Sequence, residues 1–179
     1  MLSIFGKKKI TENNVANIVV NFIFKHIESG FPELIGIVES TPEFTSCPHI
    51  DEDDVQDFMM IVLVGNLNFI PIYFNTDQEK SLRNKVIEKF AAATEISVED
   101  LHQKIKEYKE FMVRVNHPSK NMIYAMSKAF FRKYGLNDFQ EEFFKTQKVP
   151  NPIFQKRLDT VMTTYIFNWE DFIGRYKMV

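Results

Sequence analysis

The sequence predicts an all-α protein, an irregular bundle of about six to eight helices that forms a single domain over residues 1–179. Three observations support this prediction. Apolar residues recur at spacings of three and four along most of the chain, as they do on one face of an α-helix. Six Gly and seven Pro are too few for a protein dominated by loops. The 18 Phe residues, against one Trp and six Tyr, predict a core rich in aromatic rings.

The N-terminal part is expected to contain one helix that begins after Thr11 and ends at Gly30, because threonine is a good N-cap and glycine often terminates a helix. A second, short helix is expected over residues 31–38. Residues 41–50 contain two prolines and are expected to form a loop. Asp51 can then cap the next helix, with the acids that follow it in the first turn, where they interact favourably with the helix dipole.

The segment Phe58–Phe74 carries no charge and must be buried, so it is the expected central element of the fold. Its apolar spacing favours a helix that kinks or ends near Pro71. A hairpin over residues 59–74, turning at Gly65-Asn66, would instead give an α+β protein. Pro71 would then interrupt the second strand, so the helix is preferred. Two Asn, a Gly and a Pro inside the segment also argue against a membrane span.

The second half of the chain is also predicted to form helices, each starting at a capping pattern. Thr76 with Glu79 forms a capping-box pattern, and Ser97 with Asp100 forms a similar one. The last helix is expected to be long and unbroken. The expected helices cover residues 76–93, 97–115, 118–135, 137–144 and 151–176.

Composition and charge exclude several classes of protein. A single cysteine, Cys47, excludes an internal disulfide and a multi-cysteine metal site, and suits a cytoplasmic protein. The start of the chain, MLSIFGKKK, lacks the order of a secretory signal, because its short apolar part precedes the lysines. Residues 1–75 hold four Lys against ten acids, whereas the remainder has an excess of basic residues. Those bases are mixed with acids, so no nucleic-acid partner is expected.

Asp53, Asp54 and Asp57 form the one cluster that suggests catalytic chemistry. The D-D-x-x-D pattern would place three carboxylates within one helical turn, where they could hold Mg²⁺ and, through it, a diphosphate. The five residues resemble the aspartate-rich motif of helical isoprenoid synthases, although the resemblance covers nothing else and no second metal-binding motif follows. A capped, acidic helix N-terminus explains the same residues more simply. No other catalytic set is found, and no motif for nucleotide binding.

The adjacent pairs Phe130-Phe131 and Phe143-Phe144 suggest a surface for partners. Adjacent helical residues point about 100° apart, so one ring of each pair could lie exposed, unless the apolar face is wide enough to bury both. Buried Asn66 and Asn68 are expected to fix register by hydrogen bonding across helices, or to bond locally, rather than to line a pocket. The favoured function is therefore a non-enzymatic interaction module that binds a protein partner or a second copy, without a cofactor. The alternatives are the Mg²⁺-dependent enzyme and a carrier of an apolar ligand.

Overall fold

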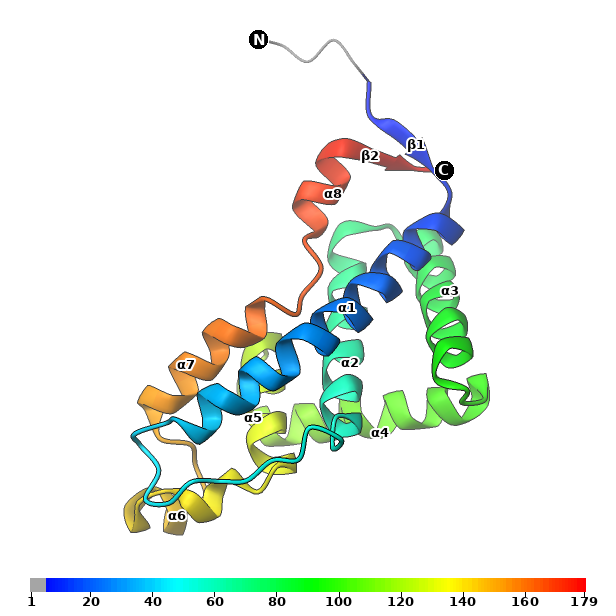
Figure 1. Ribbon diagram of the computed structural model, residues 1–179. Coiled ribbons are helices and arrows are strands. Elements are labelled where there is room, and N and C mark those ends of the chain that lie inside the picture. Colours follow the sequence, from blue (N-terminus) through cyan, green and yellow to red (C-terminus); the bar gives the residue numbers. More distant parts are fainter. Residues whose placement is uncertain (1–5) are drawn as a thin grey trace.

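The computed structural model describes residues 6–179 and has the all-α architecture that the sequence predicts (Figure 1). This part of the chain contains eight α-helices, one 3₁₀ helix and two short strands. In chain order they are β1 (Lys8–Ile10), α1 (Glu12–Glu39), α2 (Gln56–Tyr73), α3 (Thr76–Thr94), α4 (Val98–Asn116), α5 (Met122–Lys133), η1 (Leu136–Phe139), α6 (Glu142–Gln147), α7 (Pro152–Thr163), α8 (Trp169–Arg175) and β2 (Tyr176–Met178).

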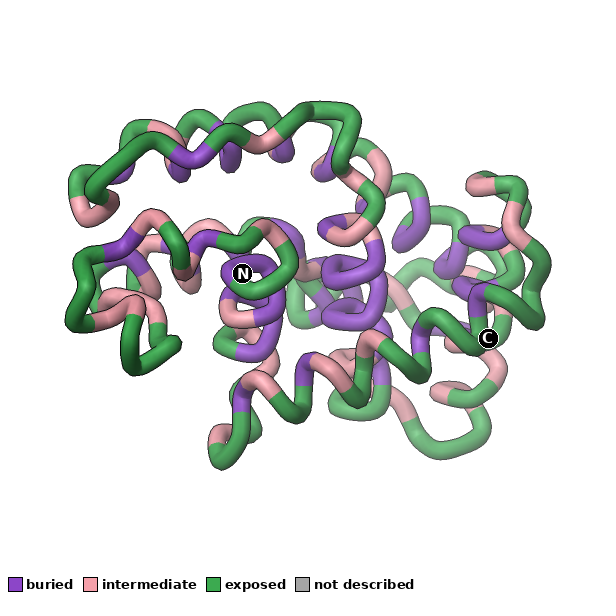
Figure 2. The backbone as a smooth tube through the Cα atoms, turned by 90° about the horizontal axis from the view of Figure 1, so that it is seen from below, coloured by how far each residue is buried: buried purple, intermediate pink, exposed green. Residues whose placement is uncertain are grey.

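The uncharged segment forms the central helix of the bundle. α2 contacts α1, α3, α4 and α5, and every residue from Met60 to Leu67 is buried (Figure 2). The helix runs through Pro71 and ends at Tyr73, so the hairpin alternative is wrong. Within residues 6–179, α2 is the one helix whose length and apolar composition would let it cross a membrane, and 56% of that stretch is buried by its neighbours. Burial in this bundle accounts for its composition without a lipid environment.

The core is rich in phenylalanine, as predicted. Six of the largest fully buried side chains are Phe rings, contributed by α1, α2, α3, α5 and α7. Phe58 of α2 stacks on Phe31 of α1 with ring centroids 5.2 Å apart, and meets Phe130 of α5 edge-on at 5.7 Å. Offset and edge-to-face pairs of this kind add to the free energy gained from area burial. The aromatic rings therefore join the helices around α2.

The first helix is longer than expected. α1 continues through Gly30 and Pro32 to Glu39, so the predicted stop at Gly30 and the separate short helix over 31–38 are wrong. Gly30 has a packing role instead: a Cβ placed there would lie 2.5 Å from Oη of Tyr165. The absence of a side chain at Gly30 leaves room for the Tyr165 ring, which follows α7, to pack against α1.

The C-terminal helix is not continuous. α7 ends at Thr163, a turn follows, and α8 begins at Trp169, so the prediction of one helix over 151–176 is wrong. Asn66 of α2 binds the turn between α7 and α8 through two hydrogen bonds. Its Nδ2 donates to the carbonyl oxygen of Tyr165 at 2.8 Å, and its Oδ1 accepts from the backbone N–H of Phe167 at 2.9 Å. Backbone groups held by Asn66 cannot join a helix. Asn66 thus fixes register, as predicted.

Several helix boundaries also differ from the sequence prediction. Asn75, rather than Thr76, caps α3, and α5 begins after Asn121 rather than at Pro118. The segment expected as one helix over 137–144 divides into η1 and α6. Ser97 caps α4, as predicted, and its hydroxyl also donates to the Asp100 carboxylate.

The two ends of the described chain meet in a small sheet that the sequence did not reveal. β1 pairs in parallel with β2, and Lys9 aligns with Lys177 (Figure 1). This sheet and α8 lie at the end of the molecule opposite to α6 (Figure 1). Because strands of three residues give almost no pattern, only the tertiary structure reveals the pairing.

Candidate functional site

The acidic residues 51–54 form a turn before α2, not its first helical turn. The backbone N–H of Asp54 donates to the carbonyl oxygen of Asp51 at 3.0 Å, and that of Asp53 donates to the Asp51 carboxylate at 3.0 Å. α2 begins at Gln56, and its N-cap position is Val55, which makes no side-chain cap. The prediction that Asp51 caps this helix is therefore wrong.

The tyrosine that follows α5 caps the start of α2 instead. The hydroxyl of Tyr134, just after α5, donates to the carbonyl oxygen of Asp54 at 2.6 Å and accepts from the backbone N–H of Phe58 at 3.2 Å. It thereby satisfies an otherwise free donor of α2 and holds the acidic turn against the bundle. Burial, and the nearby charge of Asp54, raise the pKa of Tyr134 above its usual range, so the hydroxyl keeps its proton.

Asp57 belongs to a different contact. Its carboxylate lies 3.2 Å from Nζ of Lys133 and accepts a hydrogen bond from the hydroxyl of Tyr108. Lys133 also lies over the Tyr108 ring at 4.6 Å. Burial and the bond to Asp57 raise the pKa of Tyr108 above its usual range, which makes it a poor general base. Asp57 therefore ties α2 to α4 and α5.

The prediction that the three aspartates lie within one helical turn is therefore wrong, since α2 begins at Gln56 and only Asp57 belongs to it. Asp53 and Asp54 are exposed in the turn, whereas Asp57 is half-buried and paired. Among residues 6–179 there is no group of three or more His, Cys, Asp or Glu that could hold a metal ion. Magnesium binding stays a prediction from the sequence alone.

The acidic turn instead forms one wall of an apolar groove. The groove has a volume of about 340 Å³ and lies between α1 and the start of α2. Its apolar lining combines buried and partly exposed side chains: Phe24, Ile27, Phe31, Pro32, Val55 and Met59. The apolar spacing on α1 and the loop that precedes α2 together create this hollow.

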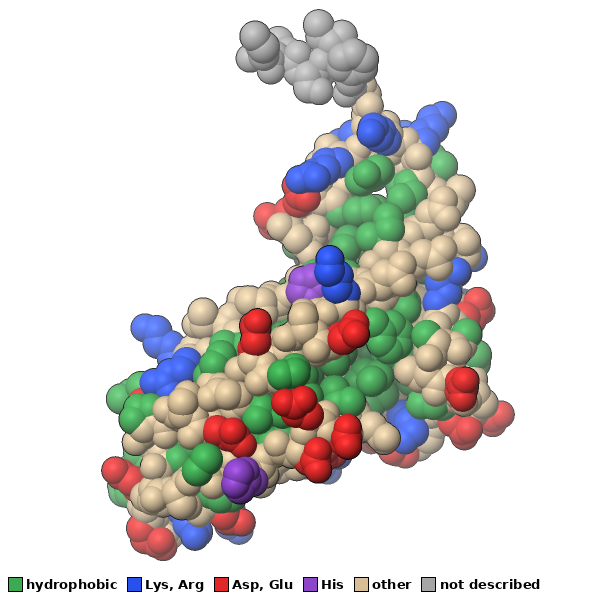
Figure 3. All heavy atoms as spheres, in the orientation of Figure 1, with side chains coloured by type: hydrophobic (Ala, Val, Ile, Leu, Met, Phe, Trp, Pro, Cys, Tyr) green, Lys and Arg blue, Asp and Glu red, His purple; other side chains and the backbone are tan. Residues whose placement is uncertain are grey.

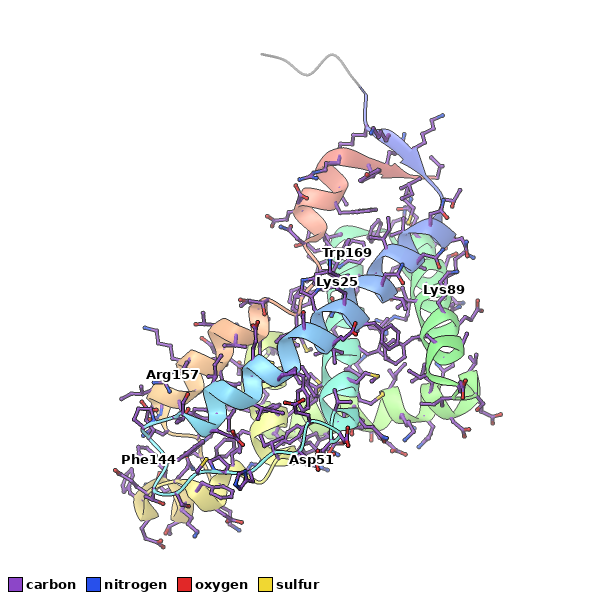
Figure 4. All side chains as sticks on the ribbon, in the orientation of Figure 1. Lys25, Asp51, Lys89, Phe144, Arg157 and Trp169 are labelled. Atoms are coloured by element: carbon purple, nitrogen blue, oxygen red, sulfur yellow. The ribbon has the colours of Figure 1, made fainter. Side chains whose placement is uncertain are left out.

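The rim of the groove is negatively charged. Glu28, Glu52 and Asp53 line it and are exposed, and no ion pair within 4.0 Å engages them in the described part of the chain. Figure 3 shows acidic side chains around apolar surface on the face formed by α1 and the loop before α2. Asp51 lies on that same face, and Lys25, three residues before Glu28 on α1, lies nearer to Trp169 than Asp51 does (Figure 4). The groove is thus apolar inside and anionic at its edge.

The predicted aromatic surface is only partly present. Phe130 and Phe131 are both fully buried, so α5 has the wide apolar face that buries both rings. Phe143 is 64% exposed in α6, and Phe144 packs edge-on against it while partly buried. Phe143 and Phe144 remain candidates for partner contact, at the far end of the molecule from α8 (Figure 4).

Sequence reasoning identified the acidic residues but missed the groove. The signal for it was divided between two segments: the apolar face of the first helix and the acids more than twenty residues later. Only the packing of α1 against α2 brings Phe31 beside Val55. Comparison of the chain with protein-family models, with characterised proteins and with solved structures gave no match, so the groove has to be interpreted from its own chemistry.

Proposed function

We propose that this protein is an interaction module whose acidic groove binds an amphipathic segment of a protein partner. The segment would place apolar side chains against Phe24, Ile27 and Met59, and Lys or Arg beside the rim. The observation that carries the proposal is the combination of an exposed apolar hollow with carboxylates that have no basic partner in the described chain.

Two physical arguments support this choice of partner. Apolar surface left in water is unfavourable, and covering it contributes about 25 cal/mol per Å² of area removed from solvent. Carboxylates at the rim raise the rate at which a basic segment arrives and disfavour an acidic one. Helices that lie in apolar grooves are a common form of peptide recognition, and the groove follows two turns of α1 from Phe24 to Pro32.

The test uses a synthetic peptide of leucine and lysine, arranged so that the leucines occupy one helical face, and its counterpart with glutamate in place of lysine. Isothermal titration calorimetry should show binding of the lysine peptide only. A Glu52→Lys/Asp53→Lys variant should weaken that binding about tenfold, since two opposite charges become like charges. Glu141→Lys/Glu142→Lys, two exposed acids of the α6 region, makes the same net charge change and should leave the affinity unchanged.

Equal affinity for both peptides, or equal losses in the two variants, would show that the groove is not the binding site. A salt titration adds a second readout. Binding that depends on the rim should weaken as ionic strength rises, because exposed charges are screened over about 10 Å at 0.1 M salt.

The alternative functions have no comparable observation in their favour. An apolar carrier needs an enclosed chamber, whereas five hollows found in the described molecule, of about 140 to 460 Å³, are open to solvent. A Mg²⁺-dependent enzyme acting on a phosphate or diphosphate ester would need carboxylates that converge on one point. Asp57 is held by Lys133 instead.

A further inference from the structure

The chain itself contains a segment with the chemistry that the groove requires. Residues 1–9 read MLSIFGKKK: four apolar side chains within the first five residues, then three consecutive lysines. Residues 1–5 lie outside the described part of the structure, while Lys7, Lys8 and Lys9 are exposed. No salt bridge within the described residues engages these three lysines. We call residues 1–9 the basic tail.

The basic tail and the groove are complementary in two respects. The apolar residues Met1, Leu2, Ile4 and Phe5 match the apolar lining between α1 and α2. The three lysines match the three rim acids Glu28, Glu52 and Asp53, with Asp51 and Asp54 in the same turn. Lysines and acids that form no salt bridge among the described residues of one copy can pair with one another between two copies.

The small sheet keeps the lysines of the basic tail away from the groove of their own copy. The groove is lined from Phe24 to Pro32, which at 1.5 Å per residue lies about 18 to 30 Å along α1 from Glu12. β1 lies before Glu12, at the end of α1 farther from the groove (Figure 1). Lys8 and Lys9 are held in β1 by pairing with Tyr176 and Lys177 of β2, so these two lysines stay at that end of α1. They therefore cannot reach the rim acids of their own groove, whereas the groove of a second copy is not restricted in this way.

We propose that the basic tail of one copy docks in the acidic groove of a second copy, so that this protein self-associates through its N-terminus. The proposal rests on the proposed function of the groove and names the partner. An exchange in which each copy donates a tail to the other closes into a symmetric pair, the commonest arrangement of soluble homo-oligomers.

Charge exchange on the full chain tests the proposal. The mass in solution is measured by sedimentation velocity over a concentration series for four chains: the unchanged protein, a tail variant (Lys7→Glu/Lys8→Glu/Lys9→Glu), a groove variant (Glu28→Lys/Glu52→Lys/Asp53→Lys), and a chain with both sets. The unchanged protein should exceed its monomer mass of 21.1 kDa. Each single set should weaken association about tenfold or more, and the combined chain should recover it, because opposite charges again face one another.

A direct titration separates this proposal from the general function of the groove. A synthetic peptide of residues 1–9 is titrated onto the tail variant and should bind, while the same peptide with glutamates at its three lysine positions should not. If the leucine–lysine peptide binds but the residue 1–9 peptide does not, the groove function stands and self-association is refuted. If neither binds, both proposals fail. If the residue 1–9 peptide binds but the unchanged protein stays monomeric at every concentration, docking in a second copy is refuted.

Discussion

Replacing Asn66 with leucine removes one amide from the centre of the molecule and tests how the C-terminal segment is held. Asn66 is 1% exposed, and its side chain makes three hydrogen bonds of 2.8 to 2.9 Å. Two of them go to the turn between α7 and α8, at Tyr165 and Phe167. Leucine has a similar volume and cannot replace these bonds, so the variant isolates the polar contribution.

The expected loss of stability in Asn66→Leu follows from the backbone groups that lose their hydrogen-bond partner. The carbonyl of Tyr165 and the N–H of Phe167 would remain in an apolar environment, and each such group costs about 1–3 kcal/mol. The third bond, to the carbonyl of Val62, matters less, because an α-helical carbonyl at that place also accepts from the helix backbone. The apolar leucine offsets part of the loss. We expect the free energy of unfolding to fall by about 2–4 kcal/mol, which lowers Tm by roughly 5–15 °C for a chain of this size.

Urea unfolding followed by circular dichroism measures the free energy, and hydrogen exchange at the Phe167 amide locates the effect. Asn68→Leu is the matched control. Asn68 is only half-buried, and its amide donates to Val64 within the same helix, so it should cost less than about 1 kcal/mol. A loss in Asn66→Leu no larger than that in Asn68→Leu, or unchanged exchange at Phe167, would refute the conclusion that Asn66 breaks the C-terminal helix.

Three other substitutions test further long-range contacts. Tyr134→Phe should cost about 1–3 kcal/mol in urea unfolding, because two hydrogen bonds at the start of α2 are lost, whereas Tyr124→Phe, at a ring 44% exposed, should cost almost nothing. Gly30→Ala should be about 2 kcal/mol less stable than Gly36→Ala in the same helix, since a methyl at Gly30 meets Tyr165 while one at Gly36 meets nothing within 4 Å; equal Tm values would contradict this. Burial, with a contribution from Glu33, raises the pKa of Tyr165 to about 12, above its usual value near 10, so the folded state holds this proton more tightly. The stabilisation is therefore complete below pH 10 and is lost as pH rises from about 10 to 12, by up to about 1.4 kcal/mol per pH unit, and Tyr165→Phe should flatten that slope.

The sequence was informative where a local pattern decides the structure. The seventeen uncharged residues from Phe58 to Phe74 could be placed in the core, and Pro71 made a hairpin the poorer choice. Ser97 with Asp100 gave the start of α4 correctly, since a capping pair lies within four residues. The abundance of phenylalanine predicted the aromatic core around Phe58. Each of these features depends on neighbours in the chain.

The errors came from contacts between distant residues. α2 starts at Gln56 rather than near Asp51 because the Tyr134 hydroxyl, 80 residues away from Asp54, holds the acidic turn. α1 continues beyond Gly30, where the glycine makes room for the Tyr165 ring instead of ending the helix. No periodicity encodes such pairings. The candidate site depends on them as well, since the groove exists only where α1, the acidic turn and α2 meet.

The contrast between Asp57 and the neighbouring acids is the strongest argument that the groove serves association. Asp57 has a basic and a hydroxyl partner, supplied by Lys133 and Tyr108 from two other helices. Asp53, four residues earlier, has no cation partner within 4.0 Å in the described chain, although Tyr134 fixes the turn that carries it. Fixing an unpaired carboxylate beside apolar surface contributes little to the stability of a lone molecule. It does lower the entropy that would be lost when a basic partner binds, because the site is already ordered.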